Sequence, residues 1–396
     1  MTAPSSEARD PGASDKPLDS TPTVAAMPAD RVVRLALSCV IEGGEPAVAE
    51  VTAISGAAAA WQQVTEGRFG EGLAERAVQL DLDRVLARAA RSRARFVVPG
   101  DEEWPERLGD LRYCDEVQRR GGVPFGLWLR GPGHLGQLAE RSVAIVGSRT
   151  ATPYGTTVAT DLGAEIAEAG FTVVSGGAYG IDTAAHQGAL AAAGPTIAVV
   201  ANGVDVAYPQ GNRKLFDWVA EHGLLVSELA PGTHPSRVRF LARNRLIAAM
   251  SVGTVVVEAA LRSGARNTAS WALGCGRMLM AVPGSVESAM SAAPHLMIRN
   301  GQAVLVSNAA EILELVSESG QATLPIPHGP VRETDVLDPV RLSVYEAVPA
   351  RRRVGAGEIA LAAGVSVPTA LAQLSALEDV GLVISDHEGW RAVVRR

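Results

Sequence analysis

The feature that most constrains the fold is a series of short apolar runs, each followed by small residues and then by a helical pattern. Such runs lie at Ser142–Val146, Thr172–Ser175, Thr196–Ala201 and Gly253–Glu258. A strand that is covered on both faces is apolar along its whole length, and strands of this kind that alternate with helices are typical of a parallel sheet. We therefore predict an α/β fold with a doubly wound, mostly parallel sheet.

The same alternation places the other elements of the sheet domain, for which we expect residues 96–316. Residues 96–140 are rich in Gly-Pro turn signals, and we interpret them as a connector that leads into the sheet. Beyond the runs above, strands are expected at Leu224–Ser227, Met278–Val282 and Ala303–Val306, and helices at Tyr154–Ala169, Asp182–Ala193, Asn212–His222, Asn244–Met250 and Asn267–Gly274.

Four further segments flank this domain. The Pro-, Ser- and Ala-rich residues 1–29 predict a disordered tail, and residues 30–95 predict a small helical domain of the SAM or helix-hairpin-helix type. Residues 317–336 have little periodicity and are interpreted as a linker. Residues 337–396 contain three helical patterns followed by a predicted hairpin, an order that predicts a winged helix; the helices are expected at Leu342–Ala347, Glu358–Ala363 and Pro368–Val380.

Composition excludes several classes of protein. The formal net charge of −7 argues against a generally basic nucleic-acid binder, so any site for a polyanion must be a local patch. The three cysteines, Cys39, Cys114 and Cys275, are far apart in the sequence and show no CxxC spacing, which argues against a zinc site and fits a reducing compartment. We find no secretory signal and no apolar run of about 18 residues, so we expect a cytoplasmic protein without membrane contact.

A cationic run precedes the strand at Gly253–Glu258. Arg237, Arg239, Arg243 and Arg245 place four cations within nine residues, and residues 232–257 contain no carboxylate. Phe240 lies inside this run, and an aromatic ring among arginines is the arrangement expected where a base stacks while its phosphates are paired. The alternative is that Phe240 belongs to the core and that the arginines form a solvated face.

Small-residue turns follow three of the predicted strands. They are Gly147-Ser148-Arg149, Ser175-Gly176-Gly177 and Arg262-Ser263-Gly264. Backbone N–H groups at such turns attract phosphate, and the carboxyl ends of parallel strands lie at one edge of the sheet. The GxGxxG fingerprint is not met in its usual context, so we discount NAD and expect no cofactor. Each turn taken alone is also compatible with an ordinary strand-to-helix connection.

Several titratable residues near these turns are candidates for a functional role, and each is weighed against a structural one. Glu258 ends its strand beside Arg262 and could act as a general base or could hold the arginines in place by ion pairing. We favour the structural role, because no second carboxylate, cysteine or histidine is close in sequence. His186 lacks an evident nucleophile or metal partner, so we expect neither a catalytic centre nor a metal site. Arg213 and Lys214 oppose the dipole of their predicted helix. A ligand phosphate could offset that cost, and the alternative is a mild penalty at the surface.

Taken in order, these segments resemble the DNA-processing protein A (DprA/Smf) family over roughly residues 97–315. The ordered combination is specific, whereas each piece alone is not. The matching stretches are Val143–Arg149 with Tyr154-Gly155, Ser175–Asp182 with Ala185-His186, Ala198–Gly203 with Tyr208-Pro209 and Asn212, Ser227-Glu228, Arg243–Ile247, Val256–Ala260 with Arg262-Ser263-Gly264, and Val282–Ser285.

The resemblance implies an extended Rossmann-like domain that binds single-stranded DNA, forms homodimers and helps to load RecA recombinase during DNA uptake and recombination. It implies no catalytic activity. Two positions depart from the family, because Tyr179 and Gln210 stand where basic residues are common. The implied DNA pocket, to which we add Lys214, consists of Arg149, Ser175, Gly176, Phe240, Arg243, Asn244, Arg245, Ser263 and Gly264.

Three hypotheses for function follow. The first is a non-enzymatic protein that binds single-stranded DNA. The second is a Rossmann-like hydrolase of a nucleotide phosphate with Glu258 as its base. The third is a transcription regulator that acts through the winged helix, against which stands the third helix, Pro368–Val380, with its Glu378 and Asp379 and no cation. For the winged helix we expect a protein-contact or regulatory role, although Arg351–Arg353 could touch phosphate.

Overall fold

The computed structural model describes residues 24–317 and 333–393. Contacts within the chain divide it into two compact units, Met1–Leu324 and Pro325–Arg396. The predicted disordered tail at 1–29 and the predicted linker at 317–336 lie largely outside the described residues. Each unit is considered by itself below, beginning with the larger one.

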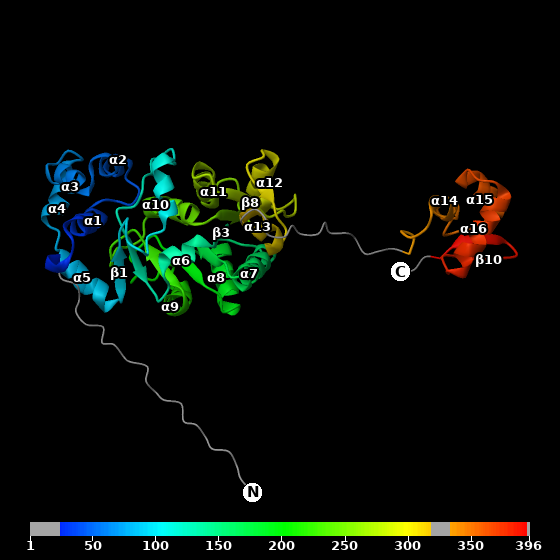
Figure 1. The fold of residues 1–396 in the computed structure, drawn as a ribbon, viewed down its shortest axis with the longest axis horizontal. Helices are drawn as coiled ribbons and strands as arrows, with labels where there is room; N and C mark the ends of the chain where they lie inside the picture. The colour runs from blue at the N-terminus through cyan, green and yellow to red at the C-terminus, as the bar shows by residue number, and fades with distance from the viewer. Residues whose placement is uncertain (1–23, 318–332, 394–396) are drawn as a thin grey trace, which may run out of the picture. The chain divides into compact units, whose positions relative to one another are not determined.

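One sheet organises the larger unit (Figure 1). Within the described residues it has nine strands in the order β1-β2-β6-β5-β4-β3-β7-β8-β9, and all neighbours from β6 to β9 run parallel. The predicted α/β class with a mostly parallel sheet is thus confirmed. The parallel strands are β3 (Ser142–Val146), β4 (Thr172–Ser175), β5 (Thr196–Val199), β6 (Leu224–Ser227), β7 (Gly253–Val256), β8 (Met278–Ala281) and β9 (Val304–Leu305).

The predicted connector at residues 96–140 contributes two strands that sequence analysis missed. Strands β1 (Ala94–Val97) and β2 (Leu127–Arg130) pair with each other and extend the sheet antiparallel beyond β6. Phe96 and Trp128 pack their rings 4.8 Å apart there. Each strand has only four residues, and the surrounding Gly and Pro residues hide so short a signal. The same stretch also holds the 3-10 helix η2 (Glu106–Tyr113) and the helix α6 (Leu135–Glu140).

Helices cover both faces of the sheet because successive side chains of each strand point to opposite sides. On β3, Ala144 and Val146 pack with residues of α10, α11 and α12, whereas Val143 and Ile145 pack with residues of α7, α8 and α13. Figure 1 shows α10–α12 above the sheet and α7–α9 below it. Their bounds are α7 (Pro153–Glu168), α8 (Ile181–Ala191), α9 (Arg213–His222), α10 (Arg237–Met250), α11 (Ala265–Gly274), α12 (Ala292–Arg299) and α13 (Ala309–Val316).

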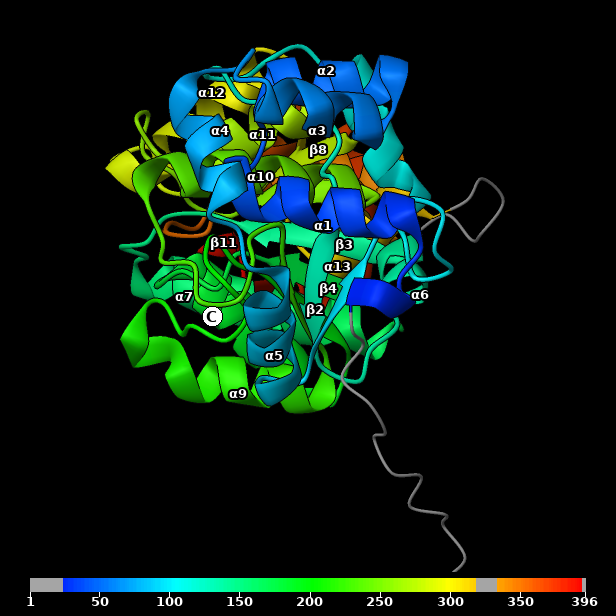
Figure 2. The ribbon, with the colours of Figure 1, turned by 90° about the vertical axis from the view of Figure 1, so that its left-hand side faces the viewer.

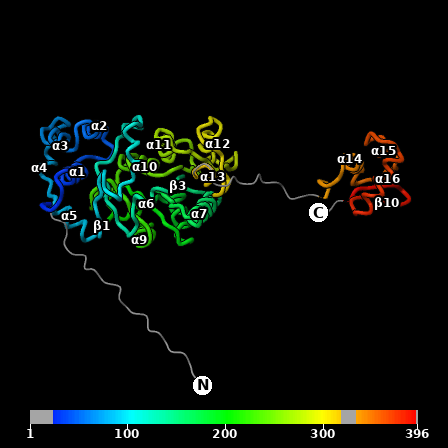
Figure 3. The backbone as a smooth tube through the Cα atoms, in the orientation of Figure 1, coloured from blue at the N-terminus to red at the C-terminus, as the bar shows by residue number. Residues whose placement is uncertain are grey.

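Between residue 24 and the first strand, the short 3-10 helix η1 (Val24–Ala26) is followed by five α-helices. Those of residues 29–78 share a small core that includes Leu37, Val48 and Val64 and closes on Phe125. Figure 2 shows α2, α3 and α4 gathered above α1, and Figure 3 follows the chain from α5 into β1. Their bounds are α1 (Ala29–Val40), α2 (Pro46–Ser55), α3 (Ala57–Thr65), α4 (Glu71–Val78) and α5 (Leu82–Arg91).

The second unit has its own core. Val344, Ile359, Leu374 and Val383 are buried in it. Its elements are α14 (Pro339–Ala347), α15 (Ala356–Ala363), α16 (Val367–Asp379) and an antiparallel hairpin of β10 (Val383–Asp386) and β11 (Gly389–Ala392). Three helices and a hairpin are the elements that the sequence predicts in this segment, while their assignment as a winged helix stays a prediction.

Across residues 24–317 and 333–393, no single helix is long and apolar enough to cross a membrane. The pair formed by α15 and α16 passes the criteria of length and composition only when both are taken together, and it is bent by 103° at the break.

Candidate nucleic-acid interface

The order of the sheet creates a crevice between β3 and β7. Strands β4, β5 and β6 lie on one side of β3, and β7 and β8 lie on the other, so the chain leaves the ends of β3 and β7 in opposite directions. Ligands of open α/β sheets bind at such a switch point. A cavity of about 750 Å³ lies here, lined by Val146–Thr150 after β3, by Ala260 and Arg262–Ala265 after β7, and by the first half of α10.

Arginine dominates the charge of this switch-point cavity. Arg149, Arg237, Arg243 and Arg262 line it, and Asp182 is the one carboxylate among the described residues that do so. Arg149, Arg237 and Arg262 are exposed, whereas Arg243 is buried beneath them. A concave surface with this excess of cations attracts anions more strongly than its net charge alone suggests, because the walls focus the field.

Arg243 forms the floor of the cavity. Its Nη1 donates to the carbonyl oxygen of Gly176 at 2.7 Å and to that of Val199, and its Nε donates to Asn244 Oδ1 at 3.2 Å. Burial, together with the nearby charge of Arg149, lowers the pKa of Arg243 to about 10, so the guanidinium stays protonated at neutral pH. A Cβ on Gly176 would lie 2.2 Å from Arg243 Nη1, and this close approach requires glycine.

Asp182 moderates the charge of this floor. Burial raises the pKa of its carboxyl group, and Arg243 opposes that rise. Ser175, predicted for the site, is buried and donates from Oγ to the carbonyl oxygen of Ile145 at 2.6 Å. Ser175 therefore ties the end of β4 to β3, and neither Ser175 nor Gly176 is among the residues that line the cavity.

Phe240 carries the aromatic face of the cavity. Its half-buried ring has Arg149 Cζ 4.7 Å and Arg243 Cζ 5.9 Å from the centroid. The ring of Tyr208, from the loop after β5, lies 5.7 Å away at 49°. Both distances to the arginines fall within the range of cation–π attraction. The geometry thus favours an accessible stacking face over the alternative that Phe240 is a core residue.

Arg245 does not belong to this site, which corrects the sequence-based assignment. Its side chain is fully buried, and its Nη2 and Nη1 contact the Glu228 carboxylate at 2.6 and 2.8 Å. Its Nε donates to the carbonyl oxygen of Gly122 at 3.0 Å. Arg243 and Arg245 lie two positions apart, and about 200° of helix rotation sends them to opposite faces of α10.

Arg239 is also engaged elsewhere. It forms a two-pronged ion pair with Glu42, with N–O distances of 2.7 and 2.8 Å. This hydrogen bond raises the pKa of Arg239 and lowers that of Glu42. Glu42 follows α1, so the pair joins the first helices of the chain to α10. Of the four cations in the run, Arg237 and Arg243 line the cavity.

The remaining predicted residues are divided between the cavity and other surfaces. Asn244 lines the cavity and donates from Nδ2 to Asn267 Oδ1 at 3.1 Å. Ser263 and Gly264 line it at the start of α11, where Ser263 Oγ accepts from the N–H of Ala265 at 3.2 Å. Lys214 is exposed on α9 and is not among the lining residues.

The cavity lining includes residues outside the sequence-predicted site, among them Arg237, Arg262 and Tyr208. Arg237 and Arg262 had been noticed as parts of the cationic run and of a turn, and the structure shows both exposed at the cavity. Tyr208 gave no comparable signal, because its contact with Phe240 depends on how the loop after β5 meets α10. The two positions that depart from the family, Tyr179 and Gln210, are not among the lining residues either.

Glu258 is hydrogen-bonded to Thr152 at the start of α7. Its Oε2 accepts from the Thr152 N–H at 2.9 Å, its Oε1 accepts from Thr152 Oγ1 at 2.6 Å, and it is 2 % exposed. A Cβ on Gly155 would lie 2.2 Å from Oε2, so the helix packs directly against this carboxylate. Glu258 does not line the cavity. Its hydrogen bonds to Thr152 favour a structural role over that of a general base, but they take the place of the ion pairing with arginines that the sequence suggested.

His186 is buried behind the sheet. Its Nδ1 lies 2.7 Å from Thr196 Oγ1, whose proton is donated to the carbonyl oxygen of Val173 at 2.8 Å. Nδ1 must therefore carry the ring proton. Burial, with Arg243 as a second cause, lowers the pKa of His186 to about 3, so the ring is neutral. Among the described residues, no group of three or more His, Cys, Asp or Glu side chains could hold a metal ion.

A doubly wound sheet with an arginine-lined crevice at its switch point defines a Rossmann-like protein with a cationic site where such sheets commonly hold ligands. The family model of DNA recombination-mediator protein A matches residues 95–317. The chain belongs to this DNA-processing protein A (DprA/Smf) family, as its sequence motifs predict.

Three comparisons illustrate the relationship. A Mycobacterium tuberculosis protein, described as a DNA processing protein DprA, is 42% identical over 357 residues, which cover 88% of this chain and 91% of that protein. The X-ray structure of DprA from Streptococcus pneumoniae has 30% identity and a TM-score of 0.60, and covers 74% of this chain and 99% of its own. A Helicobacter pylori DprA structure, whose description concerns how that protein binds single-stranded DNA, has 28% identity and a TM-score of 0.48. The match covers 56% of this chain and 95% of that one.

Proposed function

We propose that this protein binds single-stranded DNA in the switch-point cavity. The observation that carries the proposal is the accessible ring of Phe240, which lies between Arg149 and Arg243 in a cavity with a single lining carboxylate. Base stacking on aromatic rings, combined with a cationic groove for the backbone, is how proteins hold an unpaired strand. Arg149, Arg237 and Arg262 pair phosphates, while Phe240 and Tyr208 offer faces for bases.

Sequence-independent binding follows from these groups. Arginine–phosphate pairs carry no base identity, and every base has a face that can stack. Each phosphate contact releases condensed counterions, so the affinity falls steeply as salt increases. The cavity volume alone does not separate a nucleotide from a strand, because small-ligand sites span about 300–1,000 Å³. The side chains favour a strand, because exposed arginines for several phosphates line the cavity together with the aromatic face of Phe240. Among the described lining residues the one carboxylate, Asp182, is buried beside Arg243.

A salt-titrated comparison of single- and double-stranded oligonucleotides tests this proposal. Single strands of different sequence should bind with similar affinity and more tightly than duplex, and Arg149→Ala should weaken all of them about equally. Lys214→Ala is the matched control, because Lys214 is exposed but lies outside the cavity lining. Duplex binding as tight as single-strand binding, or an Arg149→Ala effect confined to some sequences, would contradict the proposal.

The competing function is hydrolysis of a nucleotide phosphate with Glu258 as base. Both oxygens of Glu258 already accept hydrogen bonds from Thr152, which leaves the carboxylate poorly placed to take a proton from water. We therefore infer that the protein is not an enzyme. Incubation with nucleoside monophosphates, followed by a search for released base or phosphate, should give no product; turnover that Glu258→Gln abolishes would favour the hydrolase instead.

At the level of the cell, we propose a homodimer in the cytoplasm that helps RecA to load on single-stranded DNA during uptake or recombination. The family description as a recombination mediator supports this role. With single strands covered by a single-strand-binding protein, adding this protein should shorten the lag before RecA filaments form. An unchanged lag would contradict the role in loading, and a monomer in sedimentation at micromolar concentration would contradict the dimer.

For the second unit we propose a protein-contact or regulatory role. Two of the three arginines at 351–353 that looked available for DNA are used within the unit, because Arg352 pairs with Glu358 and Arg353 Nη2 lies 2.7 Å from Asp386 Oδ2. Glu378 on α16 accepts from Ser385 Oγ at 2.7 Å, which ties this helix to the hairpin. A chain that ends at residue 317 should keep its affinity for DNA; tighter duplex binding by the full chain would assign a DNA-reading role to this unit.

A further inference from the structure

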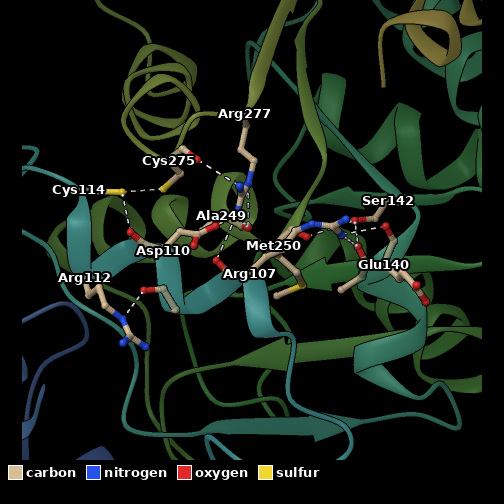
Figure 4. A network of polar contacts seen from close by, with 12 residues as sticks. Arg107, Asp110, Arg112, Cys114, Glu140, Ser142, Ala249, Met250, Cys275 and Arg277 are labelled. Atoms are coloured by element: carbon tan, nitrogen blue, oxygen red, sulfur yellow. Dashed lines mark hydrogen bonds and ion pairs between the residues drawn. The ribbon is translucent and has the colours of Figure 1, made fainter. Parts of the chain in front are cut away.

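Two cysteines that are distant in sequence meet on the side of the sheet that α10 and α11 cover. Cys114 directly follows η2, and Cys275 caps the C-terminus of α11. Their Sγ atoms lie 2.9 Å apart, although both are free thiols. A disulfide bond joins sulfur atoms at about 2.0 Å, so a movement of roughly 1 Å separates the two states. Figure 4 shows the two sulfur atoms facing each other.

Arg277 holds the two cysteine-bearing segments together without a covalent bond. Its Nη2 contacts Asp110 Oδ2 at 2.6 Å and the carbonyl oxygen of Arg107 at 3.2 Å, both on η2. Its Nη1 donates to the carbonyl oxygen of Cys275 at 3.1 Å. Figure 4 shows this guanidinium between η2 and the end of α11. The thiols are therefore kept opposite each other in the reduced protein.

The two thiols differ in access. Cys275 is 8% exposed, and burial raises the pKa of its thiol well above the usual range. Cys114 is only half-buried and follows Tyr113, which is 80% exposed. The thiolate is the reactive form and must also be reachable. A soluble oxidant therefore meets Cys114 first, and Cys275 is placed to react second. Cys39 is different, since burial raises its pKa to about 12 and its Sγ lies beside Ser38.

We propose that Cys114 and Cys275 form a reversible redox site that a low-molecular-weight disulfide such as oxidised glutathione closes. The Cys114 thiolate attacks one sulfur of that disulfide, forms a mixed disulfide and releases one glutathione thiolate. Cys275, after losing its proton, attacks the Cys114 sulfur and releases the second glutathione. Two cysteine thiols are thus oxidised, one disulfide is reduced to two thiols, and the two protons end on the two glutathione molecules.

The closed bond would cross-link a wall of the switch-point cavity. Helix α11 ends at Cys275, and its first residues line the cavity. The segment after Cys114 also contacts α11 through a hydrogen bond, in which Asn267 Nδ2 donates to Gln118 Oε1 at 3.2 Å. Asn267 in turn accepts from Asn244 on the cavity floor. A disulfide would fix the segment against α11 at a second point. The redox chemistry itself does not depend on the proposed DNA binding.

The full-length protein, treated with oxidised glutathione under native conditions, tests the proposal by mass and peptide mapping after acid quenching. We expect a monomer lighter by two hydrogens, with the Cys114 peptide linked to the Cys275 peptide, with Cys39 free as an internal reference, and with full reversal by dithiothreitol. A Cys275→Ser variant should stop at a glutathione adduct on Cys114. A Cys114→Ser variant should leave Cys275 largely unmodified.

Three results would overturn the redox site. They are a glutathione adduct that accumulates on Cys114 of the unaltered protein without closure, a disulfide between two chains in place of the internal one, and a pair that stays reduced while the Cys275→Ser variant forms its adduct. Because the first and second of these are read on the unaltered chain, the test does not depend on whether every variant folds.

Discussion

Arg243 and Arg245 lie two positions apart on one helix, yet they occupy opposite electrostatic surroundings. The charge of Arg243 is held by two carbonyl groups and an amide on the floor of the cavity, where it also influences Asp182 and His186. The charge of Arg245 is neutralised by Glu228 in the interior. The first arrangement leaves positive potential directed toward the cavity, and the second leaves none.

Arg243 and Arg245 show how a cationic run in a sequence should be interpreted. In a helix the side chains at successive odd positions rotate by about 200°, so a cluster that is dense in sequence is divided between faces. A buried charge without polar partners is too costly, so each buried arginine needs them, and away from the cavity these partners are carboxylates. Glu228 and Glu42 perform this task for Arg245 and Arg239. Four further experiments test this contrast between the two arginines and their surroundings, in decreasing order of the effect that we expect.

Replacing Arg245 should damage the fold and leave the site intact. Arg245→Met leaves Glu228 buried without a partner, and removal of one member of a buried ion pair costs about 3–5 kcal/mol. Denaturant unfolding measures this loss. The double variant Glu228→Gln with Arg245→Met should recover part of it. If Arg245→Met left the stability unchanged but weakened DNA binding, Arg245 would belong to the DNA site after all.

Lowering the pH should reveal the cost of protonating His186, which is buried and lies near the charge of Arg243. The folded pKa of His186 is about 3 against 6.5 in the unfolded chain, so between these values the unfolded state binds more protons. Stability therefore falls as the pH falls, by about 2 kcal/mol between pH 6.5 and 4.5 from this group. Denaturant unfolding at both pH values should show a smaller loss in His186→Gln. An equal loss in both proteins would mean that other groups dominate.

Phe240 should carry stacking energy that the rest of α10 does not. Phe240→Leu keeps an apolar side chain but removes the ring, and loss of one base–aromatic stack costs about 1–3 kcal/mol of binding. Titration with labelled single strands measures the change. Val238→Ala is the control, because Val238 is exposed on the same helix but does not line the cavity. Equal losses from both variants would place the DNA elsewhere on this helix.

The smallest effect should appear in the dependence of binding on salt. Arg237 lines the cavity, so Arg237→Ala should reduce the slope of log affinity against log salt by about 0.7 for each lost phosphate contact. Arg239→Ala should leave the slope unchanged, because Arg239 pairs with Glu42. Binding isotherms at several salt concentrations measure both slopes. A reversed order of the two variants would mean that the Glu42 pair opens on DNA.

Prediction of the fold succeeded where burial leaves a clear pattern. The predicted bounds of Ser142–Val146, Thr172–Ser175 and Leu224–Ser227 coincide with β3, β4 and β6. Strands covered on both faces are continuous apolar runs, and these are visible in a sequence. The helix α10 was predicted to begin at Asn244 but begins at Arg237, because basic residues in its first turns conceal the period. Its capping signal was present, since Ser236 Oγ accepts from the N–H of Arg239 at 3.3 Å.

The class of fold, the family and the edge of the sheet where the cationic cavity lies could be predicted from the sequence, because apolar runs and small-residue turns are local properties of the chain. Only the tertiary structure decided which arginines face the cavity, that Tyr208 lies beside Phe240, and that Cys114 meets Cys275. These outcomes depend on groups brought together from distant positions. Glu42 lies 197 positions from Arg239, and Cys114 lies 161 positions from Cys275, separations over which no local pattern can report a contact.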